Sequence, residues 1–250
     1  AQIINVMYNM VDRMYIGHIA DVGPSALTGV GVTMPLIMAI SAFAALVSMG
    51  GAPRASIMMG KGDKETAEKI LGNCTTMLVL MAAVLTAVIL LFGKPILLMF
   101  GASDNTIGYA WDYMSIYAMG TIFVQISLGL NAFINAQGYA RTGMLTVAIG
   151  AICNIILDPI LIFGLDMGVK GAALATILSQ AVSFVWVLRF LTSGKSFLRI
   201  RKGYLKLSAD IILPCIGLGV SPFIMQFTES IISVCFNTSL LKYGGDIAVG

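Results

Sequence analysis

Long runs of apolar residues alternate with short polar segments along the chain. A helix needs about 20 mostly apolar residues to cross a membrane, and all but the first run reach that length. The first run is expected to be an incomplete span whose beginning is missing. Strands of a membrane barrel would instead alternate apolar and polar residues in segments of about ten. The pattern predicts an all-α integral membrane protein with spans at residues 1–16, 26–49, 70–92, 112–135, 143–164, 171–192 and 210–241.

The composition agrees with this interpretation. Of the 250 residues, 58% are hydrophobic and only 11% are charged. Soluble domains carry about 25% charged residues, because charged side chains cover much of their surface. The composition therefore excludes a soluble globular protein.

Basic residues gather in alternate connectors between the predicted spans. Connectors 50–69, 136–142 and 193–209 hold most of the 15 Lys and Arg residues. Because Lys and Arg accumulate in cytoplasmic loops, we expect these connectors, and the N-terminus, in the cytoplasm. Within connector 50–69, Asp63 is placed to cap a short cytoplasmic helix.

The third of these connectors alternates basic and apolar residues over 196–207. This alternation is typical of a helix that lies on the anionic inner leaflet. A plain charged loop that links two bundles explains the same residues equally well. The sequence leaves both interpretations open.

Several polar residues lie inside the first predicted span. At 100° per residue, they fall within an arc of about 140° around the helix. Such a stripe does not face lipid, so it faces a bundle interior or a water-filled cavity. The stripe consists of Gln2, Asn5, Tyr8, Asn9, Asp12 and Arg13.

A second polar group lies in the span at 143–164. Asn154 and Asp158 are four residues apart and therefore share a helix face. Asp12 and Asp158 each precede a glycine at the outer end of their span by five or six residues. The two carboxylates are therefore expected at similar depth, and Pro159 is expected to bend the helix beside Asp158.

An acidic side chain inside a membrane is costly, so it usually has a function. A carboxylate in a partly dry cavity can bind and release a proton near neutral pH, or hold Na⁺ together with amide oxygens. In the alternative interpretation, Asp12 only neutralises Arg13, and Asp158 pairs locally. Further polar residues inside the spans are Asn131, Thr176 and a third acid, Glu229.

Four segments carry motifs that belong together. They are YNMVDRMYIG (8–17), GKGDKETAEKILGN (60–73), NAQGYARTGM (135–144) and NIILDPILIFGLDMGVKGAALAT (154–176). Together they resemble the multidrug and toxic compound extrusion (MATE) family, and within it the bacterial DinF-like or MepA-like branch.

The resemblance implies a transporter of twelve helices in two six-helix bundles. In that arrangement, residues 1–192 form the six-helix N-terminal bundle and residues 193–209 form a cytoplasmic basic linker. Residues 210–250 supply a seventh transmembrane helix, which starts the second bundle.

The resemblance also implies which residues act, because the family carries cation coupling on a polar cluster of the N-terminal bundle. By motif, that cluster would hold Tyr8, Asp12, Asn131, Asn154, Asp158 and Thr176. Secondary candidates are Asn5, Asn9 and Glu229. If Na⁺ is the coupling ion, Asp12, Asn154 and Asp158 would surround it.

The implied function is secondary-active efflux of amphipathic, often cationic, drugs or metabolites, driven by H⁺ or Na⁺ and without a cofactor. The protein would lie in the bacterial inner membrane, in contact with lipids, with no nucleic acid and no obligate protein partner.

Three other functions were weighed against efflux. A lipid or lipid-linked oligosaccharide flippase of the same superfamily would favour a cavity rich in Arg and Lys, whereas the charges inside these spans are mostly acidic. A membrane-embedded enzyme would need a His- or Cys-centred cluster, which a single His does not supply. A passive channel is disfavoured.

Overall fold

The computed structural model describes the backbone of residues 2–19 and 22–249, and the side chains of residues 10–19 and 22–245. Within these ranges the chain is helical and contains no strand, which confirms the all-α prediction. The elements are α1 (Gln2–Gly17), α2 (Gly23–Gly60), α3 (Lys64–Met99), α4 (Ile107–Met119), α5 (Thr121–Ala136), α6 (Ala140–Pro159), a π-helical turn η1 (Ile160–Gly164), α7 (Gly168–Thr192), a 3-10 turn η2 (Lys202–Tyr204) and α8 (Ala209–Val249).

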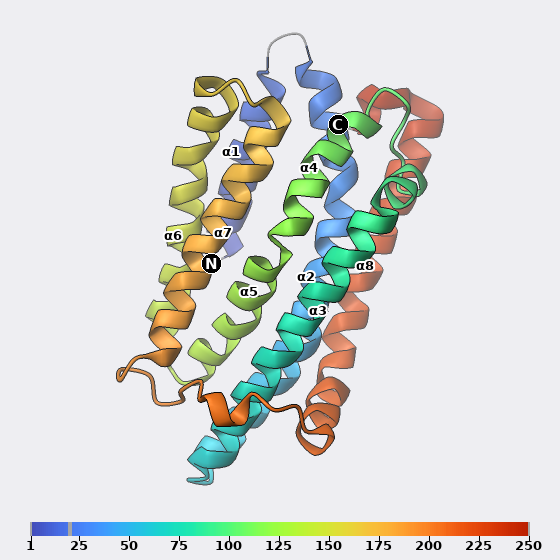
Figure 1. Ribbon diagram of the computed structural model, residues 1–250. Helices are drawn as coiled ribbons and strands as arrows, with labels where there is room; N and C mark the ends of the chain where they lie inside the picture. The colour runs from blue at the N-terminus through green and yellow to red at the C-terminus, as the bar shows by residue number, and fades with distance from the viewer. Residues whose placement is uncertain (1, 20–21, 250) are drawn as a thin grey trace.

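The helices stand side by side in one elongated bundle (Figure 1). In the described part of the chain, five helices are long and apolar enough to cross a membrane, and the bent pair α4 and α5 would make a sixth span. The protein is therefore a multi-pass membrane protein. The α2–α3 turn, the α5–α6 turn and residues 193–208 lie at the same end of the bundle (Figure 1), as alternating spans require.

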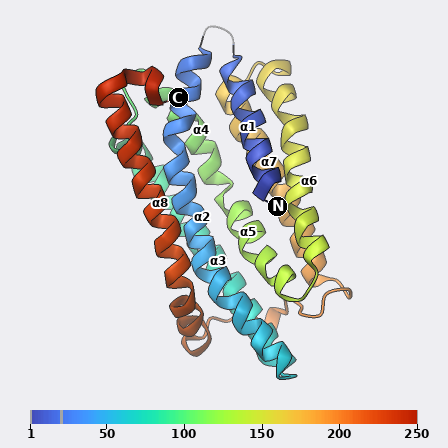
Figure 2. The ribbon, with the colours of Figure 1, turned by 180° about the vertical axis from the view of Figure 1, so that it is seen from behind.

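Two groups of helices pack within the bundle. From behind, α1 is seen between α2 and α6 (Figure 2), and it packs mainly on α6. On the other side, α8 packs along almost the whole of α2. The close approach of α8 and α2 depends on glycines, because a Cβ at Gly50 or Gly219 would overlap the facing backbone at Cys215 or Leu46.

The span predicted at 112–135 is wrong as a single helix. The structure has two helices there, α4 and α5, bent by 59° at Gly120. A side chain at Gly120 would overlap the side chain of Ile177, so α7 occupies that space. Glycine also weakens a helix interior, and together these effects place the break at this residue.

The connector predicted at 50–69 is also wrong, because most of it is helical. Helix α2 continues to Gly60 and α3 begins at Lys64, so the two helices project beyond the rest of the bundle (Figure 1). Asp63 caps α3 by accepting a hydrogen bond from the Thr66 N–H at 3.0 Å. Hydrogen bonds from the Thr66 side chain and backbone hold the pKa of the Asp63 carboxyl below its ordinary value. The cap was predicted, but the helix it starts is a span of 36 residues rather than a short cytoplasmic one.

Residues 193–208 form a loop, which is the connector between α7 and α8. Its only helical element is the three-residue turn η2, so the interpretation as a surface helix is wrong and the charged loop is confirmed. The physical reason is that its backbone groups bond to side chains of the bundle. Gln137 accepts a hydrogen bond from the Leu198 N–H, and Asn73 accepts one from the Ser208 N–H.

Candidate functional site

The site begins where α6 loses its regular hydrogen bonds. Pro159 has no N–H to donate to the carbonyl of Ile155, one turn earlier. The chain responds with the π-helical turn at Ile160–Gly164, in which the Leu165 N–H bonds to the Ile160 carbonyl at 2.9 Å. Such turns are frequent at functional sites. The bend expected at Pro159 stays a prediction, and the feature that directly follows Asp158 and Pro159 is this π-helical turn.

Asp158 and Asn154 lie on the same face of α6, inside the bundle. The side-chain amide of Asn154 donates a hydrogen bond to Asp158 Oδ1 at 3.1 Å. Asp158 is 0% exposed and Asn154 is 1% exposed. The amide therefore holds one carboxylate oxygen in a defined position.

Asp12 approaches this pair from α1. It is 3% exposed, and the helix that carries it packs mainly on α6. Arg13 is exposed, and among the described side chains no ion pair joins it to Asp12.

Three oxygens at this site have no hydrogen-bond donor within the described part of the protein. They are Asp12 Oδ1, Asn154 Oδ1 and Asp158 Oδ2, and all three are buried. Buried polar atoms almost always have a partner, so a group of orphaned acceptors is unusual. Carboxylate and amide oxygens can accept a proton or coordinate a small hard cation. The site is therefore chemically suited to bind H⁺ or Na⁺.

The structure does not bring every candidate to this site. Asn131 donates a hydrogen bond to the Gly143 carbonyl, and Gly143 lies about 16 Å along α6 from Asn154. Glu229 is exposed on α8, which packs on α2 and α3 rather than on α1 or α6. Thr176 is half-buried on α7, where its hydroxyl lies 3.4 Å from that of Tyr113. The side chains of Tyr8, Asn5 and Asn9 lie outside the described residues.

A further polar group inside the bundle was not predicted from the sequence. Gln125 is fully buried and donates a hydrogen bond to the Ile40 carbonyl at 2.7 Å, while its Oε1 has no partner in the described chain. Nearby in sequence, Ser127 donates to Gln180 on α7 at 2.9 Å. The available signal was the presence of isolated polar residues inside apolar runs. Gln125, Ser127 and Gln180 carry no charge and belong to no motif named above, so the sequence alone did not single them out.

Comparisons with known proteins agree with one another. The family model described as MatE matches residues 1–160. The chain is 25% identical over 242 residues to the multidrug export protein MepA of Staphylococcus haemolyticus, and 24% identical over 243 residues to MepA of Staphylococcus saprophyticus. Each match covers 97% of this chain and 53% of the relative, so the chain spans about half the length of the curated relatives it matches.

Solved structures give the same result. The chain is 32% identical to the MATE multidrug transporter DinF-BH, solved in complex with a drug, with a TM-score of 0.93 over 98% of this chain and 55% of that one. It is 26% identical to a multidrug resistance MATE transporter in an inward-facing conformation, with a TM-score of 0.91 over 97% of this chain and 55% of that one.

Proposed function

The chain belongs to the MatE family, and from that premise we propose that it is part of a multidrug efflux transporter that exchanges organic compounds for H⁺ or Na⁺. Members of the family are transporters rather than enzymes. The related MepA proteins are named multidrug export proteins, and the DinF-BH structure holds a bound drug. By that similarity, the proposed substrates are amphipathic, often cationic, drugs or metabolites.

The observation that carries the proposal is the group of orphaned oxygens on Asp12, Asn154 and Asp158. An unneutralised carboxylate inside a membrane costs about 2.5–3.5 kcal/mol, and here two carboxylates are buried on helices α1 and α6, which pack on each other. Binding of a proton or Na⁺ would remove much of this cost. We therefore assign the coupling cation to Asp12 and Asp158, with Asn154 as the positioning amide.

Coupling requires that cation and substrate favour different conformations. One irregular element, the π turn after Pro159, follows Asp158 directly, and a second, the break at Gly120, meets α7 at Ile177. Broken helices of this kind form ion sites in other membrane transporters. In the proposed cycle, neutralisation of Asp12 and Asp158 changes the packing of α1 against α6, and the substrate is released outward.

The proposal includes a topology. Residues 1–192 would form the first bundle, residues 193–209 the cytoplasmic linker, and residues 210–250 the first helix of the second bundle. The abundance of Lys and Arg in the connectors at one end supports placing that end, with the N-terminus, in the cytoplasm of a bacterium and the bundle in its inner membrane.

The test is efflux by the full-length transporter in everted vesicles, driven either by a pH gradient or by a Na⁺ gradient. We expect one gradient to drive ethidium transport, and Asp158→Asn and Asp12→Asn to abolish that transport. Asp112→Asn is the matched control, because Asp112 is a half-exposed carboxylate paired with Lys170 at 3.5 Å. Gradient-driven efflux that survives in both the Asp12 and the Asp158 variants would remove the assignment of the coupling site.

A further inference from the structure

A buried carboxylate outside the cation site anchors the connector. Glu68 on α3 is 2% exposed, and its Oε2 accepts a hydrogen bond from Arg201 Nε at 2.6 Å. Its Oε1 accepts a weaker one from the Arg199 N–H at 3.4 Å. Both oxygens of Glu68 therefore bind the connector, and the ion pair is partly shielded from water.

Other bundle side chains bind the backbone of the connector along its length. Gln137 accepts hydrogen bonds from the Ser196 hydroxyl and the Leu198 N–H, at 3.0 and 2.8 Å. Thr76 donates to the Leu205 carbonyl at 2.6 Å, and Asn73 accepts from the Ser208 N–H at 2.7 Å. A loop held by hydrogen bonds along its length presents its outward side chains from a fixed backbone.

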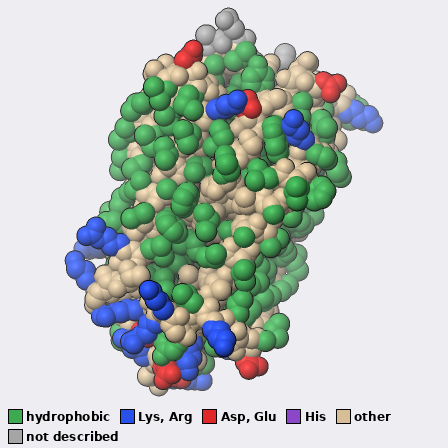
Figure 3. Space-filling view, viewed as in Figure 1, with side chains coloured by type: hydrophobic (Ala, Val, Ile, Leu, Met, Phe, Trp, Pro, Cys, Tyr) green, Lys and Arg blue, Asp and Glu red, His purple; other side chains and the backbone are tan. Residues whose placement is uncertain are grey.

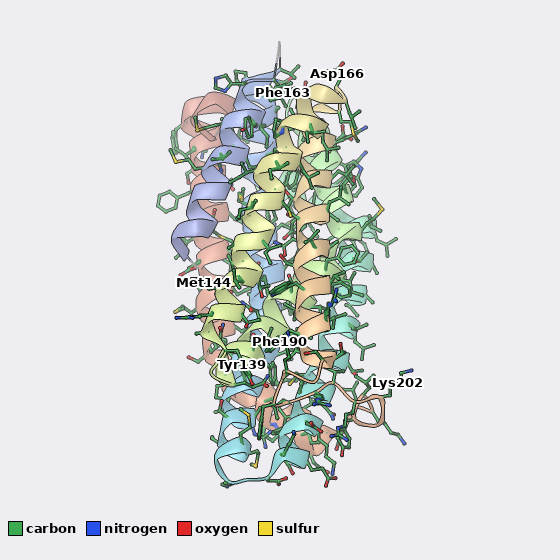
Figure 4. The ribbon with its side chains drawn as sticks, turned by 90° about the vertical axis from the view of Figure 1, so that its left-hand side faces the viewer. Tyr139, Met144, Phe163, Asp166, Phe190 and Lys202 are labelled. Atoms are coloured by element: carbon green, nitrogen blue, oxygen red, sulfur yellow. The ribbon has the colours of Figure 1, made fainter. Side chains whose placement is uncertain are left out.

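The outward side chains are mostly cations. Residues 193–208 contain no Asp or Glu. Lys195, Arg199, Lys202 and Lys206 are exposed, and none of them forms an ion pair with a described residue. Lys202 lies at the outer edge of the molecule, below the paired rings of Tyr139 and Phe190 (Figure 4). Basic side chains gather over this end of the molecule, whereas the middle band is largely hydrophobic (Figure 3).

Two exposed apolar side chains accompany these cations. Phe197 is 47% exposed and Leu207 is 43% exposed. The Lys64 ammonium of α3 lies 4.6 Å from the centre of the Phe197 ring. The connector joins the ends of two predicted spans, so these side chains lie near the level where a bilayer surface is expected. Apolar and basic groups together suit the boundary between lipid headgroups and acyl chains.

We propose that the docked connector is a binding surface for the phosphate headgroups of anionic phospholipids, with Lys195, Arg199, Lys202 and Lys206 as the cations that contact them. The proposal uses the orientation given above, because anionic lipid is most abundant in the cytoplasmic leaflet. It is otherwise independent of the transport cycle. Glu68 is a positioning residue that neutralises Arg201 and fixes the loop, so the four remaining cations face the lipid.

The test measures lipid binding to the purified full-length transporter by thermal shift, with phosphatidylglycerol or phosphatidylcholine added to the detergent. We expect phosphatidylglycerol to raise the unfolding temperature and phosphatidylcholine to raise it much less. The double variant Lys202→Gln/Lys206→Gln should need about 25-fold more phosphatidylglycerol for the same shift, since each basic group at an anionic surface contributes about fivefold. High salt should weaken the wild-type response.

The matched control is Lys94→Gln/Lys242→Gln, which removes two exposed cations at the opposite end of the bundle and should keep the wild-type response. An equal loss in both double variants would overturn the proposal, since net charge alone would then explain it. An equal shift with inorganic phosphate would also overturn it, because the site would then be for a free anion. Efflux activity is not a readout here, so failure of this proposal and failure of the cation-site proposal remain distinguishable.

Discussion

Two buried carboxylates, Asp158 and Glu68, occupy opposite situations in the same bundle. Both are nearly inaccessible, at 0% and 2% exposure. Glu68 has a donor on each oxygen, and one of them is the guanidinium of Arg201. Asp158 has only the neutral amide of Asn154 on one oxygen, and its other oxygen has no partner among the described residues.

The difference shows that hydrogen-bond and ion-pair partners, rather than burial, distinguish a structural carboxylate from a candidate cation-binding one. A buried carboxylate that pairs with a cation and an N–H donor can fix structure, because removal of one partner leaves the other unpaired. A buried carboxylate without such partners is costly in the membrane unless a mobile cation binds it. Glu68 therefore anchors the connector, whereas the role proposed for Asp158 is to exchange a cation.

The largest expected effect is on transport, and it separates the two carboxylates. Asp158→Asn should abolish gradient-driven ethidium efflux, so that its rate per folded protein falls to that of membranes without the transporter. Glu68→Gln should leave that rate near wild type. The measurement is efflux from energised cells, normalised to the amount of protein in the membrane.

The thermal stability of the same two variants is the control. Asp158→Asn should not lower the unfolding temperature, because the amide removes a buried charge that lacks a partner. A large drop for Asp158→Asn, equal to that for Glu68→Gln, would show that both carboxylates are structural.

The next largest effect is expected on stability, for substitution of a glycine that packs closely near Asp158. A Cβ at Gly171 would lie 2.6 Å from the Leu161 carbonyl oxygen, in the π turn that follows Asp158. Gly171→Ala should therefore destabilise the bundle by about 1–3 kcal/mol. Gly203→Ala in the connector is the matched control, because no atom lies within 4 Å of its added Cβ. Equal unfolding temperatures for the two variants would contradict the close packing of α7 on η1.

Loss of the ion pair between Glu68 and Arg201 should lower stability less than Gly171→Ala does. Glu68→Ala removes two hydrogen bonds, but Arg201 is 57% exposed and regains water. The expected loss is about 1–2 kcal/mol, below the usual range for a buried pair. Thermal unfolding measures the loss, and limited proteolysis should show faster cleavage within residues 193–208. A connector that stays protected in Glu68→Ala would mean that Asn73 and Gln137 hold it without Glu68.

The smallest effect is expected for Asp63, a fully exposed carboxylate that only caps α3. Its pKa is lowered in the folded state, so its contribution to stability is present above its ordinary pKa and is lost as the pH falls. Asp63→Ala should therefore lower the unfolding temperature slightly at pH 7 and by less at pH 3. A similar decrease at both pH values would mean that the cap does not depend on the charge.

Periodicity and spacing predicted much of the fold and part of the candidate site. The apolar runs located the helices, and the spacing of Asn154 and Asp158 placed them on one face, where the structure finds a hydrogen bond. The break at Gly120 was not predicted, because its cause is the side chain of Ile177 from another helix. The partners of Glu68 were not predicted either, since Arg201 lies far from it in sequence.

The sequence by itself determined that this is an all-α membrane protein of the MATE family with acids inside its spans, because these properties depend on composition, short-range periodicity and local motifs. Only the tertiary structure decided which of those polar atoms are satisfied. That depends on contacts between distant segments: α1, which carries Asp12, packs on α6, which carries Asp158, whereas Asn131 bonds to Gly143 elsewhere on α6. Whether a buried carboxylate has a donor is a property of packing, and no pattern along the chain records it.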